Sequence, residues 1–396
     1  MFIRLLIIHI LGICFINNIT CQVRLKDNNI NVNTFKKIKD IIIFKDTNYY
    51  TSFPSVIKKD DGVLLLVFRS APDRRLLGNQ VQDHLDPHSY IKYVESHDDG
   101  ESWTDPKLLF AHPYAGSQDP CLYQMEDGTI LCASYLWEYI HPTTIPNLKM
   151  PHLERRGFLF SGGYLLRSND SGKTWDGPIY PPSTPYEKSF NSKGEKISAY
   201  NRGQMCEGSD GKLYWAVSSA DTYDPKRKTS NYLMVSEDKG STWEYLSRIA
   251  IDDTVIFNET SLYETPKGDL VAFLRTGNFN DQACITRSTD RGKTFEQWEP
   301  MGFKGHPLQA TRLPDNRVLL VYGYRHKPYG IRARILNPEC TNYLSAPEFI
   351  IRDDGGNGDI GYPWAVYLGN NRILVSYYFN VENGPRHIAG SILEIE

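Results

Sequence analysis

One eight-residue pattern occurs four times in the chain and constrains its fold more than any other feature. The copies are SHDDGESW at 96–103, SNDSGKTW at 168–175, SEDKGSTW at 236–243 and STDRGKTF at 288–295. In each copy the aspartate is placed to accept hydrogen bonds from backbone N–H groups of its own turn. The glycine tolerates a positive φ, and the aromatic ring is suited to pack against a sheet. Four such turns indicate a repeat protein built of β-hairpins.

A second, fainter repeat marks six hairpins, each with two β-prone runs around a turn that contains Gly or Asn. The six segments are 54–69, 120–135, 203–218, 260–275, 308–323 and 363–378. Further strand-like runs, such as YIKYVES and GYLLRS, follow the hairpins and lead into the Asp-Gly turns. One unit is therefore a four-stranded meander, the blade of a propeller. We predict an all-β fold, a single six-bladed β-propeller domain of four-stranded antiparallel blades over 22–396.

The phase of the strands also assigns each turn to a face of the propeller. If the first strand of each unit is innermost and runs away from one face, the hairpin turns and the Asp-Gly turns all lie on the far face. We therefore expect Asp170 to stabilise its turn and Trp175 to pack into the core behind it. Both should be remote from any site at the near face. The strand-like run FKKIKDIIIFKDT near residue 40 precedes the first blade, and we expect it to close the ring by pairing with the last.

Polar and aromatic residues open the inner strands, where the blades of a propeller converge on one axial cavity. Aligning the hairpins gives Phe53, Asp119, Arg202, Glu259, Pro307 with His306 beside it, and Tyr362. The ends of two second strands add Arg69 and Arg275 at equivalent places. Each polar residue taken singly has an ordinary explanation as a paired structural ion. Taken together they indicate a shared binding cavity, and clustered arginines indicate a carboxylate in the ligand.

The repeated turns resemble the Asp-boxes, or BNR repeats, of sialidases, which are six-bladed propellers that remove terminal sialic acid. The resemblance extends over about residues 50–380. VFRSAP resembles the family's Phe-Arg-Ile-Pro element, which implies that Arg69 is the first arginine that binds the substrate carboxylate. NETSLYETPKGDLVAFLR is similar to the segment with the catalytic glutamate and the second arginine, here Glu259 and Arg275.

The same resemblance implies the remaining groups of the site. GIRARILN is similar to the segment with the third arginine, best placed at Arg332, with Arg325 as the alternative. IGYPWAVYLGNNRILVSYY resembles the closing segment with the nucleophilic tyrosine, Tyr362. In the family an aspartate between the first arginine and the first Asp-box is the general acid. Asp86 in QDHLDPHSY is the best match and Asp83 the alternative.

The resemblance implies hydrolysis with retention of configuration. An anionic nucleophile would meet the carboxylate of sialic acid, whereas a neutral tyrosine polarised by a glutamate avoids this repulsion. Sialidases are accordingly an exception to the scheme of paired carboxylates. A general acid must still protonate the leaving oxygen, and His84 and His88 are alternatives that tune or replace the aspartate.

The sequence also departs from the family pattern. Ser70 stands where the Phe-Arg-Ile-Pro element has Ile, and Ala71 is inserted. Asp119, Arg202 and His306 have no counterpart in the family scheme, and we expect them to bind substrate. Two alternatives therefore stay open: a propeller glycosidase or lyase acting on another sugar, such as a uronic acid or rhamnose, and a non-catalytic carbohydrate-binding propeller. The presence of both a tyrosine and a glutamate at strand openings favours the enzyme.

Composition narrows the partners. A formal net charge of -3 argues against broad binding to nucleic acid. The cysteines beyond the N-terminus are odd in number and lack CxxC spacing, so we expect neither a disulfide framework nor a metal site, and no cofactor. The loop 136–160 is rich in aromatics and Pro, and we expect it to form a wall of the pocket. The expected partner is a glycan with an acidic terminal sugar, bound by a monomer.

The N-terminal run MFIRLLIIHILGICFINNITCQ is typical of a secretory signal peptide, which we place at 1–21. We therefore expect a secreted or periplasmic protein. Lipid attachment at Cys21 is an alternative that the residues before it fit poorly. No later stretch offers the roughly 18 consecutive apolar residues that a membrane helix needs.

Overall fold

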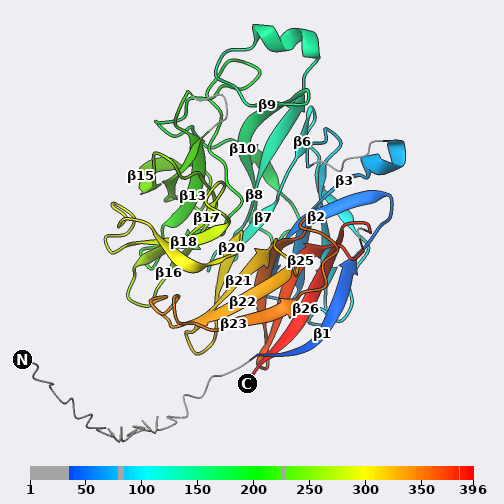
Figure 1. Ribbon diagram of the computed structural model, residues 1–396, viewed down its shortest axis with the longest axis vertical. Helices are drawn as coiled ribbons and strands as arrows, with labels where there is room; N and C mark the ends of the chain where they lie inside the picture. Colours follow the sequence, from blue (N-terminus) through cyan, green and yellow to red (C-terminus); the bar gives the residue numbers. More distant parts are fainter. Residues whose placement is uncertain (1–34, 79–83, 224–227, 383) are drawn as a thin grey trace, which may run out of the picture. The chain divides into compact units, whose positions relative to one another are not determined.

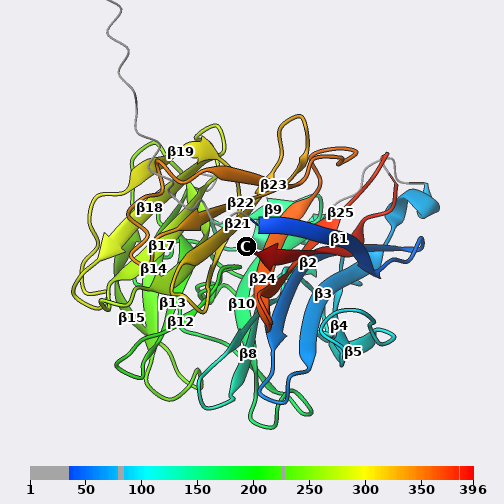
Figure 2. The ribbon, with the colours of Figure 1, turned by 90° about the horizontal axis from the view of Figure 1, so that it is seen from below.

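Six antiparallel sheets form the blades of a β-propeller in the computed structural model, which describes residues 35–78, 84–223, 228–382 and 384–396 (Figures 1 and 2). The predicted fold class is confirmed. The proposed signal peptide at 1–21, with Cys21, and the alternative acid Asp83 lie outside the described residues. No helix in the described ranges is both long enough and apolar enough to cross a membrane.

The first three blades follow one another along the chain. The strands of blade one are β2 (Tyr49–Lys58), β3 (Leu64–Pro72), β4 (Tyr90–Ser96) and β5 (Lys107–Phe110). Those of blade two are β6 (Ala115–Ser117), β7 (Cys121–Gln124), β8 (Ile130–Tyr139), β9 (Glu154–Arg155), β10 (Phe158–Ser168) and β11 (Asp176–Ile179). Those of blade three are β12 (Cys206–Glu207), β13 (Leu213–Ala220), β14 (Thr229–Ser236) and β15 (Glu244–Ala250). In blade two the inner strand is split, because β6 and β7 both pair with β8.

The last three blades complete the ring. The strands of blade four are β16 (Phe257–Glu264), β17 (Leu270–Thr276), β18 (Gln282–Ser288) and β19 (Glu299–Lys304). Those of blade five are β20 (Leu308–Arg312), β21 (Val318–Tyr324), β22 (Gly330–Leu336) and β23 (Glu348–Arg352). Those of blade six are β24 (Gly361–Gly369), β25 (Arg372–Phe379), β26 (His387–Ile395) and β1 (Phe35–Phe44). Two short 3₁₀ helices lie in connections, η1 (Arg74–Leu77) and η2 (Pro142–Asn147).

The N-terminal strand closes the ring, as predicted. β1 pairs antiparallel with β26, with Ile41 opposite Gly390, so blade six contains strands from both ends of the described chain (Figure 1). Phe35 and Ile43 of β1 are buried. β1 thereby supplies the outermost strand of blade six and ties the two ends of the described chain together.

The Asp-Gly turns are structural locks, as predicted. In the first copy Asp98 accepts hydrogen bonds from the backbone N–H of Ser102 at 2.9 Å and from its hydroxyl at 2.6 Å. These bonds lower the pKa of Asp98 to about 2. The residue before each glycine also adopts a positive φ, as Asp99 does at 55°, so two consecutive residues are left-handed rather than the glycine alone. The same bonds recur around Asp170, Asp238 and Asp290.

Strand register places these turns away from the inner-strand openings. Leu64, at the start of β3, pairs with Ser96, where the first Asp-Gly turn begins. Arg69, further along β3, pairs with Ser52 beside the opening of the inner strand. The turns therefore lie at the opposite end of the blade from the predicted site.

The apolar core lies between the blades. Residues 64–68 of β3 are buried without interruption, because both faces of a blade pack against neighbouring blades. One cluster joins Phe68 of blade one, Leu131 of blade two and Trp215 of blade three. The cysteines that the structure describes are buried and free, and they occupy the core as small apolar residues.

Candidate active site

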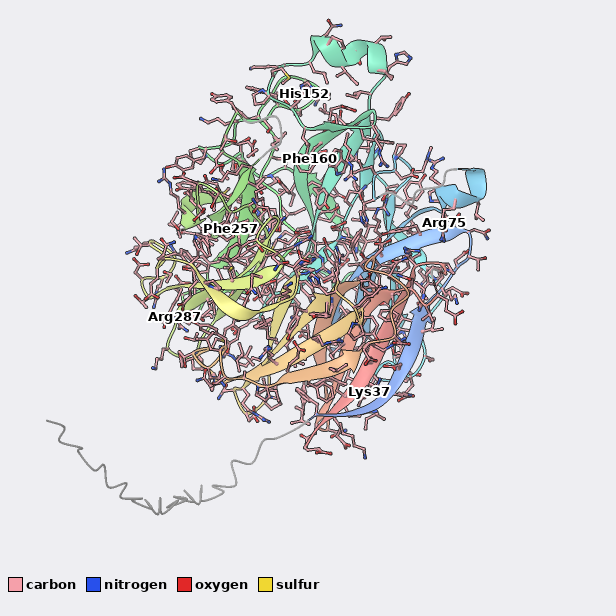
Figure 3. All side chains as sticks on the ribbon, in the orientation of Figure 1. Lys37, Arg75, His152, Phe160, Phe257 and Arg287 are labelled. Carbon is pink, nitrogen blue, oxygen red and sulfur yellow. The ribbon has the colours of Figure 1, made fainter. Side chains whose placement is uncertain are left out.

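A pocket at the near face collects side chains from all six blades. Its volume is about 270 Å³. Of the residues predicted to open inner strands or to bind substrate, the pocket is lined by Phe53, Asp119, Arg202, Glu259, Arg275, Arg325 and Tyr362. The loop predicted to form a wall contributes Trp137, Arg155 and Phe160, and Phe160 is labelled in Figure 3. The residues identified by aligning the hairpins in the sequence thus meet at one concave site.

Three of these residues form a closed triangle of hydrogen bonds. The hydroxyl of Tyr362 donates to Oε1 of Glu259 at 2.5 Å. One guanidinium nitrogen of Arg275 donates to the same carboxylate oxygen at 2.7 Å and to the Tyr362 hydroxyl at 2.8 Å. Glu259 and Arg275 come from neighbouring strands of blade four, whereas Tyr362 opens blade six. The phenol, the carboxylate and the guanidinium are therefore in mutual contact near the axis.

The electrostatics of the triangle keep the proton on the tyrosine. Burial, and then the charge of Glu259, raise the pKa of Tyr362 well above its ordinary value. Burial acts to raise the pKa of Glu259 as well, but Arg275, the hydrogen bond from Tyr362 and Arg325 outweigh it, so the pKa of Glu259 is lowered. In the resting site a neutral phenol consequently faces an ionised carboxylate. This is the arrangement of an activated nucleophile with its base.

Three arginines surround the ring of Tyr362. The guanidinium carbons of Arg202, Arg325 and Arg275 lie 4.7, 5.4 and 5.9 Å from its centroid. Arg202 donates to the carbonyl of Pro54 at 2.6 Å, and Arg325 donates to the hydroxyl of Tyr378 at 2.9 Å. The guanidinium groups are thus fixed by bonds outside the pocket.

The lining of the pocket carries an excess of positive charge. Its basic side chains include Arg155, Arg202, Arg275 and Arg325, whereas its carboxylates are Asp119 and Glu259. Guanidinium groups in a partly enclosed site attract and orient an anionic ligand.

Two strand openings hold a strained backbone. Phe53 has φ 57° and Tyr362 has φ 52°, and each precedes a proline. Their rings pack edge to face with centroids 4.6 Å apart. A bulky residue in the left-handed region costs free energy, and such residues gather at functional sites. The sequence pattern located both residues but gave no sign of this conformation.

Two predicted site residues lie behind the pocket rather than in it. Arg69 is fully buried and donates to the backbone carbonyl of His84 at 2.7 Å, so it supports a residue that lines the pocket. Asp86 is held by Arg74 of η1 through bonds of 2.7 and 3.0 Å and is absent from the pocket lining. An aspartate bound in this way is poorly placed to donate a proton to a ligand in the pocket.

Of the two arginines considered for the third position, Arg325 lines the pocket and Arg332 does not. Arg332 lies on β22, the third strand from the axis, where it donates to the backbone carbonyl of Pro328 at 3.2 Å. Arg325 directly follows β21, the second strand, and reaches the pocket. Arg275 occupies the corresponding end of the second strand in blade four.

His306 is buried beneath the arginines rather than exposed to the pocket. Its Nδ1 lies 3.4 Å from Asp281, and it is not among the lining residues. Burial, followed by the charges of Arg275 and Arg325, lowers its pKa well below the ordinary value, so the imidazole is neutral. We assign it no contact with a ligand.

Sequence reasoning missed a half-buried hydrogen-bond centre at Asp359, in the segment that precedes Tyr362. Its carboxylate accepts bonds from the hydroxyls of Tyr50 and Tyr378 at 2.9 and 3.0 Å and from Arg386 at 2.8 Å. Burial acts to raise its pKa, but the charges of His84, Arg386 and Arg325 prevail and lower it. Through Tyr378 this centre orients Arg325. Its only sequence signal is its position three residues before the tyrosine.

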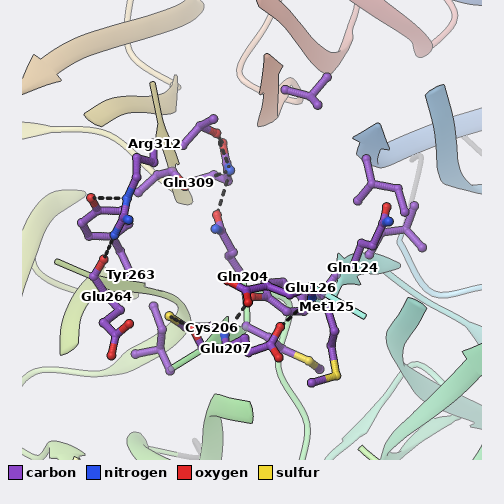
Figure 4. A pocket seen from close by; sticks show the side chains of 18 of the residues that line it. Gln124, Met125, Glu126, Gln204, Cys206, Glu207, Tyr263, Glu264, Gln309 and Arg312 are labelled. Carbon is purple, nitrogen blue, oxygen red and sulfur yellow. Dashed lines mark hydrogen bonds between the residues drawn. The ribbon is translucent and has the colours of Figure 1, made fainter. Parts of the chain in front are cut away.

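A larger cavity of about 740 Å³ lies toward the far face, lined by later residues of the inner strands (Figure 4). Its polar side chains bond to one another or to backbone. Gln309 donates to Gln204 at 2.7 Å, and Arg312 donates to the hydroxyl of Tyr263 at 3.2 Å and to the carbonyl of Glu264 at 2.5 Å. The candidate site is therefore the smaller pocket, where the phenol and the carboxylate meet.

Comparisons with known proteins agree with the fold. The family described as BNR repeat-like domain matches residues 155–371. A crystal structure of a protein of unknown function from Dyadobacter fermentans DSM 18053 is 57% identical, covers 91% of this chain and 99% of that chain, and has a TM-score of 0.89. No curated protein matches the sequence.

Sialidase structures share the fold at much lower identity. The NanB sialidase from Streptococcus pneumoniae is 13% identical with a TM-score of 0.64, over 89% of this chain and 70% of that chain. The intramolecular trans-sialidase from Ruminococcus gnavus is 14% identical with a TM-score of 0.58, over 90% of this chain and 97% of that chain. These likenesses support the propeller architecture.

Proposed function

The chain belongs to the BNR repeat-like family, and on that premise we propose that it is a glycosidase that removes a terminal acidic sugar from glycans with retention of configuration. Sialic acid, or a related acidic sugar, is the proposed substrate class. The observation that carries the proposal is the triangle of Tyr362, Glu259 and Arg275. A propeller fold alone is shared by many functions, so the site must decide.

The triangle supports a covalent mechanism. Glu259 accepts the phenol proton while Tyr362 Oη attacks the anomeric carbon, forming a glycosyl–tyrosine intermediate that water then hydrolyses. Arg275 contacts both groups and stabilises the negative charge that moves from Glu259 toward the phenol oxygen. The neutral resting phenol avoids repulsion with an anionic sugar, which is the circumstance in which tyrosine replaces a carboxylate nucleophile.

The arginines support an acidic substrate. Arg202, Arg275 and Arg325 approach Tyr362 from three blades and form the proposed site for the sugar carboxylate. A guanidinium binds a carboxylate through two parallel hydrogen bonds, which fixes orientation as well as affinity. Tyr135, Trp137 and the other aromatic lining residues offer flat apolar surfaces to the sugar ring.

The proposal is tested with fluorogenic sialoside, glucuronide and rhamnoside substrates supplied in parallel to the full chain. We expect turnover of an acidic glycoside and loss of that turnover in Glu259→Ala. Glu264→Ala, in the same strand but at the far-end cavity, is the matched control and is expected to retain activity. Binding of acidic sugars without turnover of any substrate would instead establish a carbohydrate-binding propeller, and turnover of the rhamnoside alone would exclude the proposed acidic substrate.

We also propose that residues 1–21 direct export, which suits an enzyme acting on extracellular glycans. Expression of the full chain in a secreting host, followed by N-terminal sequencing of the product, tests this. A mature protein that begins near residue 22 is expected. An uncleaved protein retained inside the cell would contradict the proposal.

A further inference from the structure

The proposed mechanism needs a proton donor that the tyrosine and glutamate do not supply. Departure of the glycosidic oxygen requires protonation by an acid within reach of the bound ligand. Among the described residues that line the pocket, the carboxylic acids are Asp119 and Glu259. Glu259 already binds Tyr362 and Arg275 and is held in its ionised form. The inference that follows rests on the proposed function.

Asp119 occupies a backbone position that fixes its side chain at the pocket. It lies in the split of the blade-two inner strand, between β6 and β7, which both pair with β8. The preceding residue is held on both sides, because Gln118 N–H donates to the carbonyl of Tyr135 at 2.9 Å and the hydroxyl of Ser134 donates to the Gln118 carbonyl. Asp119 is thus presented by a short break between two strands whose preceding residue is hydrogen-bonded on both sides.

The carboxyl group of Asp119 is buried and incompletely bonded. The residue is only 2% exposed although it lines the pocket. Tyr135, on the neighbouring strand, acts electrostatically on this carboxyl group. Within the described parts of the chain, Asp119 Oδ1 has no partner. A buried polar atom without a partner costs free energy, so a ligand or water that supplies one is strongly favoured there.

The surroundings of Asp119 favour its protonated form. Burial, and then the charge of Glu259, raise the pKa of Asp119 to about 6, while Tyr135 and Arg202 act in the opposite direction. Two carboxyl groups in one pocket thus have their pKa values pushed apart, the mark of an acid and a base with different roles. The geometry of the pocket and the environment of the group point to the same residue.

We propose that Asp119 is the general acid of this site. In the first step Tyr362 Oη bonds to the anomeric carbon as the glycosidic bond breaks. The phenol proton passes to Glu259, and the Asp119 proton passes to the leaving oxygen. In the second step water attacks the anomeric carbon and gives its proton to Asp119, while the released phenolate recovers its proton from Glu259. Both carboxyl groups return to their starting states.

Two leaving groups distinguish this role from a structural one. An activated aryl glycoside needs little protonation of its leaving oxygen, whereas an unactivated disaccharide of the same sugar depends on it. We expect Asp119→Asn to lower kcat/KM for the disaccharide by about 10²–10⁴-fold, with a far smaller loss for the aryl glycoside. Asp86→Asn, the matched control, is expected to keep the wild-type ratio between the two substrates.

Several results would overturn the inference. An equal loss on both substrates for Asp119→Asn, or a leaving-group-dependent loss for Asp86→Asn alone, removes Asp119 from the acid role. An inactive wild-type protein overturns the proposed function and this inference together. An active wild type that requires Tyr362 but tolerates Asp119→Asn overturns the inference alone.

A second variant keeps the test decisive if Asp119→Asn does not fold. Tyr135→Phe removes a hydroxyl group that acts to lower the pKa of Asp119. Because the acid must be protonated, we expect the basic limb of the kcat/KM profile to move to higher pH. A profile that keeps the wild-type basic limb would contradict the assignment.

Discussion

Tyr362 and Glu259 share a hydrogen bond of 2.5 Å although they open the inner strands of different blades and lie 103 residues apart. Neither residue could adopt this relationship through local structure. It depends on the ring being closed, so that six strand openings converge on one axis. The contact between Tyr362 and Glu259 therefore depends on the whole propeller rather than on any one blade.

Replacing the phenol hydroxyl should abolish chemistry while preserving binding. We expect Tyr362→Phe to lower kcat by about 10³-fold or more, since nucleophile and base act as a unit. The matched control is Tyr377→Phe, the neighbouring tyrosine of blade six, whose hydroxyl bonds to Ser391 at 2.7 Å. Steady-state kinetics and calorimetric binding of the acidic monosaccharide measure the two effects. Similar kcat losses in both variants would indicate a general defect of blade six.

The two arginines of blade five should differ in their effect on substrate binding. We expect Arg325→Lys to raise KM for an acidic glycoside by about 10–100-fold, the equivalent of losing one charge-assisted hydrogen bond. Arg332→Lys should leave KM near the wild-type value, because that side chain bonds to backbone carbonyls of its own blade. A KM defect in the Arg332 variant alone would restore the assignment suggested by the sequence resemblance.

The acidic limb of the pH profile should report Glu259. The carboxylate must be ionised to accept the phenol proton, so activity falls as the pH drops through its lowered pKa. Arg325 is one of the charges that lower this pKa. We therefore expect Arg325→Gln to move the acidic limb of kcat/KM to higher pH. Measurement of kcat/KM across the acidic range checks this, and an unmoved limb would show that Arg325 does not act on Glu259.

The Asp-Gly turns should make stability sensitive to acid. The folded-state pKa of Asp290 is about 2, below the ordinary 3.8, because the hydroxyl and the backbone N–H of Thr294 bond to its carboxylate. Its contribution is present above pH 3.8 and is lost as the pH falls through about 2. At pH 6, Asp290→Asn is therefore expected to have a lower melting temperature than the wild type. Near pH 2 the two melting temperatures are expected to lie closer together. Asp253→Asn, an exposed aspartate outside these turns, is the control.

The architecture could be predicted because each blade repeats the same local chemistry. Turn residues and strand-like runs recur at similar relative positions in each repeat. Aligning the repeats by their turns is enough to identify the residue that opens each inner strand. Ring closure by β1 followed from one further strand-like run before the first blade. The repeats did not show that two consecutive residues of each Asp-Gly turn, such as Asp99 and Gly100, are left-handed. Glycine is the residue type that indicates this conformation in a sequence.

The site could be predicted only as far as register determines it. Register located Asp119, Arg202, Glu259 and Tyr362, which open inner strands. An arginine of blade five reaches the axis if it follows the second strand, and does not if it lies on the third. Strand boundaries predicted from sequence are not accurate enough to separate these two cases.

Contacts between segments that are distant in the chain could not be predicted from the sequence. Asp86 lies between the first arginine and the first Asp-box, as the family acid does, but Arg74 of a short helix that no pattern indicated binds it. Asp359 bonds to Tyr50 across 309 residues. Such pairs follow from the closed ring and leave no periodic signal in the sequence.

The guanidinium of Arg202 lies over the ring of Tyr362 on one side and 5.0 Å from the ring of Trp364 on the other. Tyr362 lines the near-face pocket and Trp364 lines the far-end cavity, so this layer is the floor between them. The near-face pocket is thus bounded, on the side of the far-end cavity, by this layer of side chains. On the proposed function, such a floor would limit entry to the outermost unit of a glycan, because the chain of an internal unit continues in both directions.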